Sequence, residues 1–282
     1  MRRFWTTFLY TLGSFRGQIL GWGLGIASLG LMVVAYYGVF SSGKSDFAQM
    51  IENYPSEFLA FFGGDANTIL TPEGFVGMYA FSMLPLILGI FVLAAGSLLI
   101  VGDEERGRLD LILSHPVGRN AFFFARLSAF GCALLGILLV SWLGFCVLLD
   151  SSTMDITWGR MVLPFLSLMA QGLVYGMLAL LLSLLLPSRS LSATITGLVL
   201  VTSYFLSSMA FMDEKLQTIA KFLPHAYYQG TTAFHDFNLT WFFSLLGICA
   251  GMALWAWRLF VRRDIRLSGE GSWKLPAFSR RN

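Results

Sequence analysis

At residues 75–101 the chain reads FVGMYAFSMLPLILGIFVLAAGSLLIV, with no Asp, Glu, His, Lys or Arg among them. A helix rises about 1.5 Å per residue, so this stretch is long enough to cross the roughly 30 Å hydrocarbon core of a membrane. Lipid offers no partner for backbone polar groups, so an apolar segment of this kind spans as a helix. The six predicted spans are Ile19–Phe40, Phe75–Val101, Leu127–Leu149, Met161–Leu186, Leu191–Met212 and Leu239–Trp257.

The composition points the same way. The chain has 282 residues, of which 56% are hydrophobic and only 12% are charged, which is typical of a polytopic membrane protein and excludes an ordinary soluble domain. We expect an all-α fold forming a single transmembrane domain over residues 1–282. Within it, residues 1–18 form an interfacial helix, residues 19–261 contain the six spans, and residues 262–282 form a cytosolic tail.

The first residues suggest the interfacial helix by their spacing. Phe4, Phe8, Leu12 and Phe15 recur at helical intervals, with hydroxyl-bearing and amide side chains on another face. A ribbon of glycines follows at strict four-residue intervals, a pattern that lets another helix approach closely. The alternative is that membrane helices are simply rich in glycine. The four glycines predicted to pack a helix are Gly13, Gly17, Gly21 and Gly25.

The charges predict the topology. If the N-terminus lies inside, the inner segments hold 15 of the 19 basic residues and six of the 16 acidic ones. The positive-inside rule then places both termini in the cytosol and the chain in the cell membrane as a multi-pass protein. The basic balance is therefore a topology signal, and we expect no nucleic-acid partner.

The spans contain no charged side chain that could act as a relay. Ion-coupled carriers keep Asp, Glu, His, Lys or Arg inside the membrane, so energy for any transport here should come from elsewhere. One span does carry a stripe of hydroxyl groups. Such groups usually bond back to their own helix and help packing, and lining a substrate path is the alternative. The stripe consists of Ser192, Thr196, Ser203 and Ser207.

The loop between the second and third spans is the place to receive that energy. Residues 102–119 read GDEERGRLDLILSHPVGR. Leu109 and Leu113 give a short apolar face, and Pro116 disfavours helix at the residue before it. We expect a helix, a turn and a second helix, whose apolar tip with charged shoulders suits a groove on a partner protein. A merely solvated loop would explain the charges but not the apolar tip.

This loop resembles the cytosolic loop of membrane subunits of ABC transporters of the type-2 exporter class, in the branch with separate permease and ATPase chains. Arg108 stands where the family usually has threonine, which affects one local contact. The resemblance covers nearly the whole chain. Further similar stretches are Tyr54-Pro55, Thr71-Pro72-Glu73-Gly74, Pro224–Tyr228 and Phe260–Ile265.

The resemblance implies a permease without enzymatic activity of its own. It implies a dimer, formed with a second copy or a related permease, above ABC ATPase subunits that hold ATP and Mg, while this chain binds no cofactor. Membrane lipids surround it, and the cargo of such exporters is a lipid, drug, antibiotic or polysaccharide. An alternative is a membrane adaptor or immunity protein that binds a partner without transport. The residues implied to couple to the ATPase are Glu104, Glu105, Gly107, Leu109, Leu113, Pro116 and Arg119.

Two motifs imitate nucleotide-binding sequences. Residues 38–45 read GVFSSGKS and match the phosphate-loop pattern, but they follow a membrane helix, and the charges place Lys44 outside. Residues 267–271 read LSGEG and imitate an ABC ATPase signature, in a tail too short to fold an ATPase core. We therefore expect no nucleotide site on this chain.

His225, His235 and Asp236 cluster in one predicted outer segment. Two histidines ten residues apart do not define a metal site, and residues of an aromatic interfacial loop are the favoured explanation. We expect no metal on this chain, and the sequence leaves the role of these three residues open.

Overall fold

The computed structural model describes residues 2–43, 66–105, 107, 118–210 and 214–262. All the secondary-structure elements within these ranges are helical. Six helices are long and apolar enough to cross a membrane, which confirms the predicted all-α fold and the six spans. They are Arg3–Ser42, Pro72–Leu98, Arg119–Ser151, Trp158–Leu185, Arg189–Ser208 and Leu239–Arg262.

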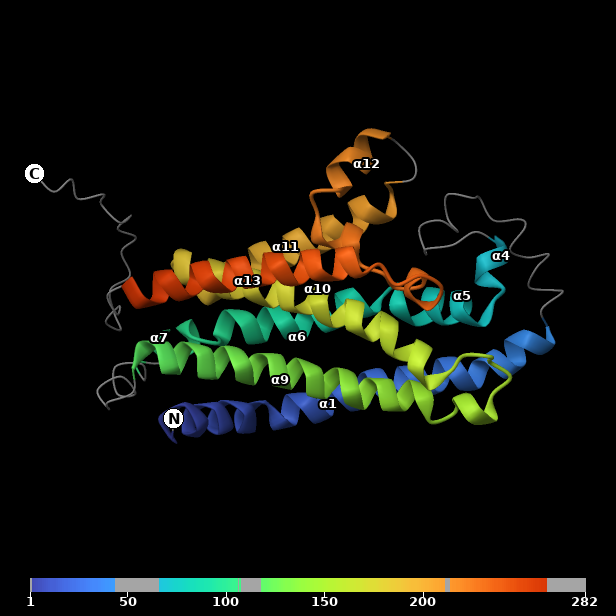
Figure 1. Ribbon diagram of the computed structural model, residues 1–282, viewed down its shortest axis with the longest axis horizontal. Coiled ribbons are helices and arrows are strands. Elements are labelled where there is room, and N and C mark those ends of the chain that lie inside the picture. Colours follow the sequence, from blue (N-terminus) through green and yellow to red (C-terminus); the bar gives the residue numbers. More distant parts are fainter. Residues whose placement is uncertain (1, 44–65, 106, 108–117, 211–213, 263–282) are drawn as a thin grey trace, which may run out of the picture.

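The spans form an elongated bundle (Figure 1). On one side of it, α1 (Arg2–Ser42) and α9 (Arg119–Cys146) run side by side. Helix α10 (Trp158–Leu185) is central, and α11 (Arg189–Ser208) and α13 (Leu239–Arg262) lie on the other side. The start of α1 and the end of α13 lie at the same end, which we name the inner end; the opposite end is the outer end.

Helix α1 corrects one expectation. The interfacial helix predicted for residues 1–18 is not a separate element, because residues 2–18 are the first turns of a continuous helix of 41 residues. No proline interrupts it, and the hydroxyls of Thr7, Thr11 and Ser14 bond to carbonyls of the same helix. At about 1.5 Å per residue the helix is roughly 60 Å long, more than a bilayer needs. That its first turns lie on the membrane surface stays a prediction.

The second span is broken near its middle. Pro85 has no N–H to donate to the carbonyl of Phe81, four residues earlier. The hydroxyl of Tyr228 donates to that carbonyl instead, at 2.9 Å. The break therefore ties a segment near the C-terminus to the second span. The span consists of α5 (Pro72–Val76), the π-helical turn η1 (Gly77–Phe81) and α6 (Leu84–Leu98).

Glycine allows α1 and α9 to touch along their length. A Cβ atom at Gly30 would collide with the ring of Phe145, and one at Gly144 would collide with Ala27. Small residues permit this close backbone approach, which drives helix association in lipid. The remaining short helices are α4 (Ala66–Ile69), α7 (Val101–Glu105), η2 (Leu149–Ser151), α12 (Glu214–Ala220), η3 (Pro224–Tyr227) and η4 (Thr232–Phe234).

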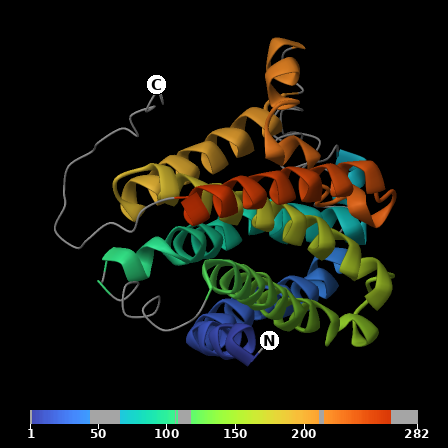
Figure 2. The same ribbon diagram turned by 60° about the vertical axis from the view of Figure 1, so that its left-hand side comes forward.

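The outermost helices leave apolar faces open. In the most apolar stretch of α10, 72% of the residues are buried, against 28% in α11 and 11% in α13. Figure 2 shows α12 projecting sideways beyond the end of α11, away from the α1 and α9 pair. Lipid or another subunit therefore has to cover the open sides of α11 and α13.

Candidate functional site

The predicted coupling loop connects α7 and α9, and the end of α7 and the start of α9 lie at the inner end of the bundle. Gly107 ends the first arm: its φ is 64°, a conformation that glycine adopts readily, and its N–H donates to the Glu104 carbonyl at 3.0 Å. Arg119 begins the second arm as the first residue of α9. The predicted tip residues Leu109, Leu113 and Pro116 lie outside the described residues.

The first arm is joined to the start of α11. Glu105 Oε2 lies 2.8 Å from Arg189 Nε, and the Arg189 backbone N–H donates to Glu105 Oε1 at 3.2 Å. Arg189 is the first residue of α11, where exposed N–H groups and the helix dipole favour a carboxylate. Both side chains are partly exposed, at 37% for Glu105 and 42% for Arg189, so water and salt weaken this pair.

The second arm is joined to the end of α13. Arg119 Nη1 donates to the Val261 carbonyl at 3.1 Å, and the Trp257 indole N–H donates to Asn120 Oδ1 at 3.0 Å. Aromatic rings of α9 also stack on Phe260, one turn before the end of α13. Each arm of the loop therefore contacts a span other than the one that carries it.

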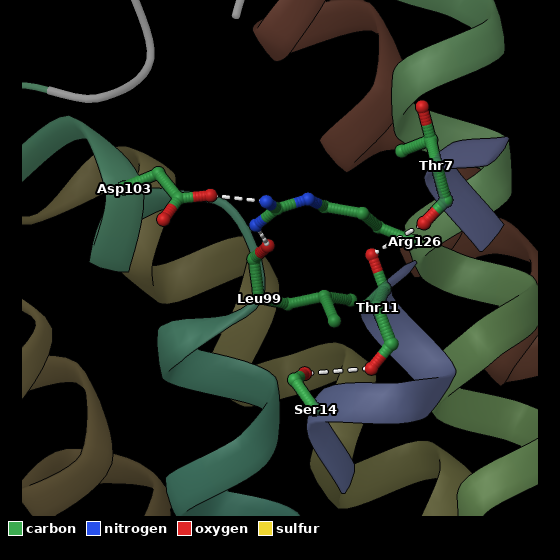
Figure 3. Close-up of polar contacts among 6 residues, drawn as sticks. All are labelled: Thr7, Thr11, Ser14, Leu99, Asp103 and Arg126. Carbon is green, nitrogen blue, oxygen red and sulfur yellow. Dashed lines mark hydrogen bonds and ion pairs between the residues drawn. The ribbon is translucent and has the colours of Figure 1, made fainter. Parts of the chain in front are cut away.

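A buried ion pair lies between the two arms (Figure 3). Arg126 of α9 reaches across to Asp103 of α7 and donates to the Leu99 carbonyl at 2.5 Å. That carbonyl is available because the Asp103 N–H bonds to Ile100 instead of closing the regular helical turn. The Arg126 guanidinium also stacks over the Phe122 ring, 4.5 Å from its centre, and the residue is 8% exposed.

The pair of Asp103 and Arg126 was not predicted from the sequence. The available signal was weak, because 23 residues separate the two. A sequence can nevertheless show opposite charges next to the facing ends of two successive spans, as with Asp103 after the second predicted span and Arg126 before the third. Arg189 was missed in the same way, as the lone charge between the predicted fourth and fifth spans.

The predicted hydroxyl stripe of α11 faces the inside of the bundle. Ser192 donates to the Ala179 carbonyl of α10 at 2.6 Å, and Thr196 donates to the Ser192 carbonyl at 2.8 Å. Ser203 accepts the His225 backbone N–H at 3.1 Å. The buried Ser207 hydroxyl has no partner among the described residues. This geometry favours the packing role, and a role in a substrate path stays a prediction.

A comparison with protein families identifies the family of the chain. A family model described as ABC-2 family transporter protein matches residues 2–265. The chain belongs to this family. Among curated proteins, the comparison finds no match. The resemblance drawn from the loop is thereby confirmed, and the chain is a membrane-embedded permease protein of the ABC-2 class.

The glycine ribbon of this ABC-2 protein faces outward. A Cβ at Gly17, Gly21 or Gly25 would meet nothing within 4 Å among the described residues, and one at Gly13 would meet only the end of the Arg16 side chain. The close approach inside the chain uses other glycines of α1. Packing of the ribbon against a helix therefore stays a prediction, and it concerns a neighbouring molecule.

His225 and His235 of the ABC-2 protein lie in different environments. His225 Nδ1 lies 2.7 Å from Gln171 Nε2, and burial lowers the pKa of its imidazole from 6.5 to about 4. His235 is exposed. Across the described part of the chain, no group of three His, Cys, Asp or Glu side chains could hold a metal ion.

Proposed function

We propose that this ABC-2 protein is the permease subunit of an ATP-driven exporter. In this proposal it lies in the cell membrane with both termini in the cytosol, works as a dimer and is driven by separate ABC ATPase subunits that bind ATP and Mg. The spans predicted from the sequence contain no charged side chain, and Arg126 comes just before the third of them, which supports an external energy source. The charge distribution supports the cytosolic position of the inner end.

The observation that carries the proposal is the pair of links at the loop arms. Glu105 contacts the start of α11, and Arg119 contacts the end of α13. An ATPase that moves the loop would therefore displace these two spans together with α6 and α9. Since α11 and α13 have the lowest buried fractions of the six spans, movement at the loop would reach a surface where a second permease or a substrate can bind.

The open face of α11 supports an amphipathic or hydrophobic cargo. Leu198, Val201 and Phe205 recur at helical spacing, and 67%, 43% and 46% of their respective surfaces are exposed. The hydroxyl stripe lies on the inward side of the same helix. If α11 borders the export route, then this apolar face lines it, which suits a lipid, drug or antibiotic better than a free sugar or ion.

The test uses the full complex of this permease with its ABC ATPase, reconstituted in liposomes. Glu105→Arg and Arg189→Glu each place like charges together, and we expect both to lower transport-coupled ATP turnover. Combining the two substitutions restores an opposite-charge pair, so turnover should recover. Arg258→Gln is the matched control, since it removes an exposed arginine of α13 near the inner end.

Two results would contradict the proposal. Failure of any ABC ATPase to bind the folded permease would remove the energy source. Unchanged turnover in both single variants would show that the first arm does not transmit the movement. The tip gives an independent check, since Leu109→Ala removes a predicted docking anchor. Such a loss commonly costs about 2 kcal/mol of binding, or roughly thirtyfold in affinity.

A further inference from the structure

A pocket of about 330 Å³ opens at the inner end between α1, α6 and α9. Its polar lining comes from Thr11, Ser14 and Gln18 of α1, together with Asp103 and Arg126. Since a water molecule occupies roughly 30 Å³ of liquid, the pocket has room for about ten waters or for one small polar group. Known small-molecule sites begin near this size.

Arg126 is incompletely satisfied in this pocket. Its Nη atoms bind Asp103 and the Leu99 carbonyl, but its buried Nε has no partner among the described residues. An arginine carries five N–H donors, and these two contacts use only one on each Nη, so Arg126 keeps Nη hydrogens for an acceptor in the pocket that it lines, whereas the buried Nε is closed to a ligand. A phosphate oxygen is an acceptor that arginine binds through charge-assisted hydrogen bonds.

The wall formed by α1 has the opposite need. The Thr11 hydroxyl donates to the Thr7 carbonyl at 2.8 Å, and the Ser14 hydroxyl donates to the Thr11 carbonyl at 2.6 Å. Each hydroxyl has only one hydrogen, so the two oxygens can offer the pocket only their lone pairs. Figure 3 shows this wall beside Arg126 and Leu99. These two oxygens therefore suit a ligand that donates hydrogen bonds, while Tyr10 and Gln18 of the same wall can donate or accept.

The charge of the pocket restricts the ligand further. Asp103 and Arg126 carry one negative and one positive charge, so an added phosphate alone would be repelled by the Asp103 carboxylate. A ligand that carries a phosphate and an ammonium group satisfies both. A primary ammonium brings three N–H donors for the oxygens of Thr11, Ser14 and Asp103, whereas a quaternary ammonium brings none.

The position of the pocket indicates what the rest of the ligand is. Leu98 ends the second span, and the predicted first span begins at Ile19, so the pocket lies where the hydrocarbon core meets the headgroups. Phe15, Ala95 and Leu98 line its apolar side. We propose that the pocket binds the headgroup of a phosphatidylethanolamine-type lipid from the inner-end leaflet, with its acyl chains outside the pocket. This site is independent of the coupling to an ATPase.

The test measures lipid association with the full chain in nanodiscs made of phosphatidylcholine. Trace lipids carry the same spin label on an acyl chain and differ only in headgroup: ethanolamine, choline or glycerol. We expect the motionally restricted fraction to show a preference of about tenfold or more for the ethanolamine lipid over the other two, the size expected for one added charge-assisted hydrogen bond. Equal association of the three, or a preference for the anionic glycerol lipid, would overturn the proposal.

Matched variants locate the site. Ser14→Leu blocks the α1 wall, and Thr11→Val removes an acceptor at nearly constant volume; both should abolish the ethanolamine preference. Ser28→Leu is the control, because that exposed serine makes the same bond to its own helix, to the Gly25 carbonyl at 2.8 Å, away from the pocket. Retained preference in both pocket variants, or equal loss in the control, would overturn the assignment. Full competition by millimolar soluble phosphoethanolamine would assign the site to a soluble zwitterion instead of a lipid.

Discussion

The two ends of the bundle are held together by different chemistry. At the inner end, charged side chains join the spans: Asp103 with Arg126, Glu105 with Arg189, and Arg119 with a backbone carbonyl. From the middle of α10 towards the outer end, neutral groups do so, among them Gln171 with His225 at 2.7 Å. Charged side chains therefore make the main links at the inner end, whereas neutral hydrogen bonds hold the segment 224–238 against the spans.

This difference separates two tasks. Partly exposed ionic links contribute little free energy of unfolding, and they can break and re-form at small cost when a partner moves them. Buried neutral hydrogen bonds are expensive to leave unmade, so they fix a segment in place. The inner end is thus suited to transmitting movement, and the outer end is suited to holding residues 224–238 against the spans. Arg126 is the exception at the inner end, because it is buried.

The largest expected effect follows from that exception. Arg126→Ala leaves the Asp103 carboxylate partly buried without its partner, which should lower the free energy of unfolding by about 3–5 kcal/mol. The measurement is denaturant unfolding of the chain in detergent micelles. Replacing both residues, as Asp103→Leu with Arg126→Met, removes both charges and should return the stability to near the wild-type value. A single variant as stable as the wild type would show that the inner end contains no buried ionic link.

The contact between Asp103 and Arg126 could not be predicted from the sequence, although the spans could. The six spans and their common ends were predictable because every span is a long apolar run. Asp103 and Arg126 could be seen as charges near span ends, but their contact depends on the distorted turn that frees the Leu99 carbonyl. That turn results from tertiary packing, and the spacing of residues in the sequence does not predict it.

The next effect concerns the outer end. Ser167→Ala removes the hydroxyl that accepts the Gln229 backbone N–H at 2.8 Å, in a position where both residues are about 1% exposed. Leaving this N–H unpaired should lower the free energy of unfolding by about 1–3 kcal/mol. Ser183→Ala is the matched control on the same helix, because that buried hydroxyl bonds only to the Leu180 carbonyl of its own helix. Equal losses of stability in the two variants would show that the bond between Ser167 and Gln229 contributes no more than a hydroxyl bonded within its own helix.

The outer end was only partly predictable for a similar reason. The sequence identified the hydroxyls of Ser192, Thr196, Ser203 and Ser207 but could not tell which way α11 turns them. Burial of that face against α10 and α6 decides it. The long helix α1 gives the complementary lesson: its amphipathic start resembled a separate element, yet local spacing alone cannot show whether one helix ends before the next begins.

A smaller effect should depend on pH. His225 faces Gln171, Ser203 and the rings of Tyr204 and Tyr228, all of them uncharged. Because burial lowers its pKa from 6.5 to about 4, the unfolded chain binds a proton between these values and the folded chain does not. Stability should therefore fall as the pH falls from about 6.5 towards 4, and the loss should level off below that.

The measurement is unfolding in detergent over this pH range, with His225→Asn as the reference variant. Asparagine retains a polar group for Gln171 but does not titrate, so the difference between the wild type and the variant isolates His225 from the carboxylates. A difference that is independent of pH from 7 to 4, across the interval set by the His225 pKa, would show that the imidazole is not held neutral by the fold.

For Lys44→Ala we expect no change in ATP turnover, which is the smallest effect of the series. Lys44 comes two residues after the end of α1 at Ser42 in the sequence and belongs to a phosphate-loop pattern, but α1 starts at the inner end and finishes at the outer end. If ATP is used at the inner end, Lys44→Ala should leave ATP turnover of the permease complex unchanged, whereas a true phosphate-loop lysine contacts the nucleotide and cannot be removed without loss. Single cysteines at Lys44, Asp155 and His235 should all react with an impermeant reagent applied from outside the cell. Labelling of position 44 only from the cytosol, together with a large loss of turnover in Lys44→Ala, would exchange the roles assigned to the two ends.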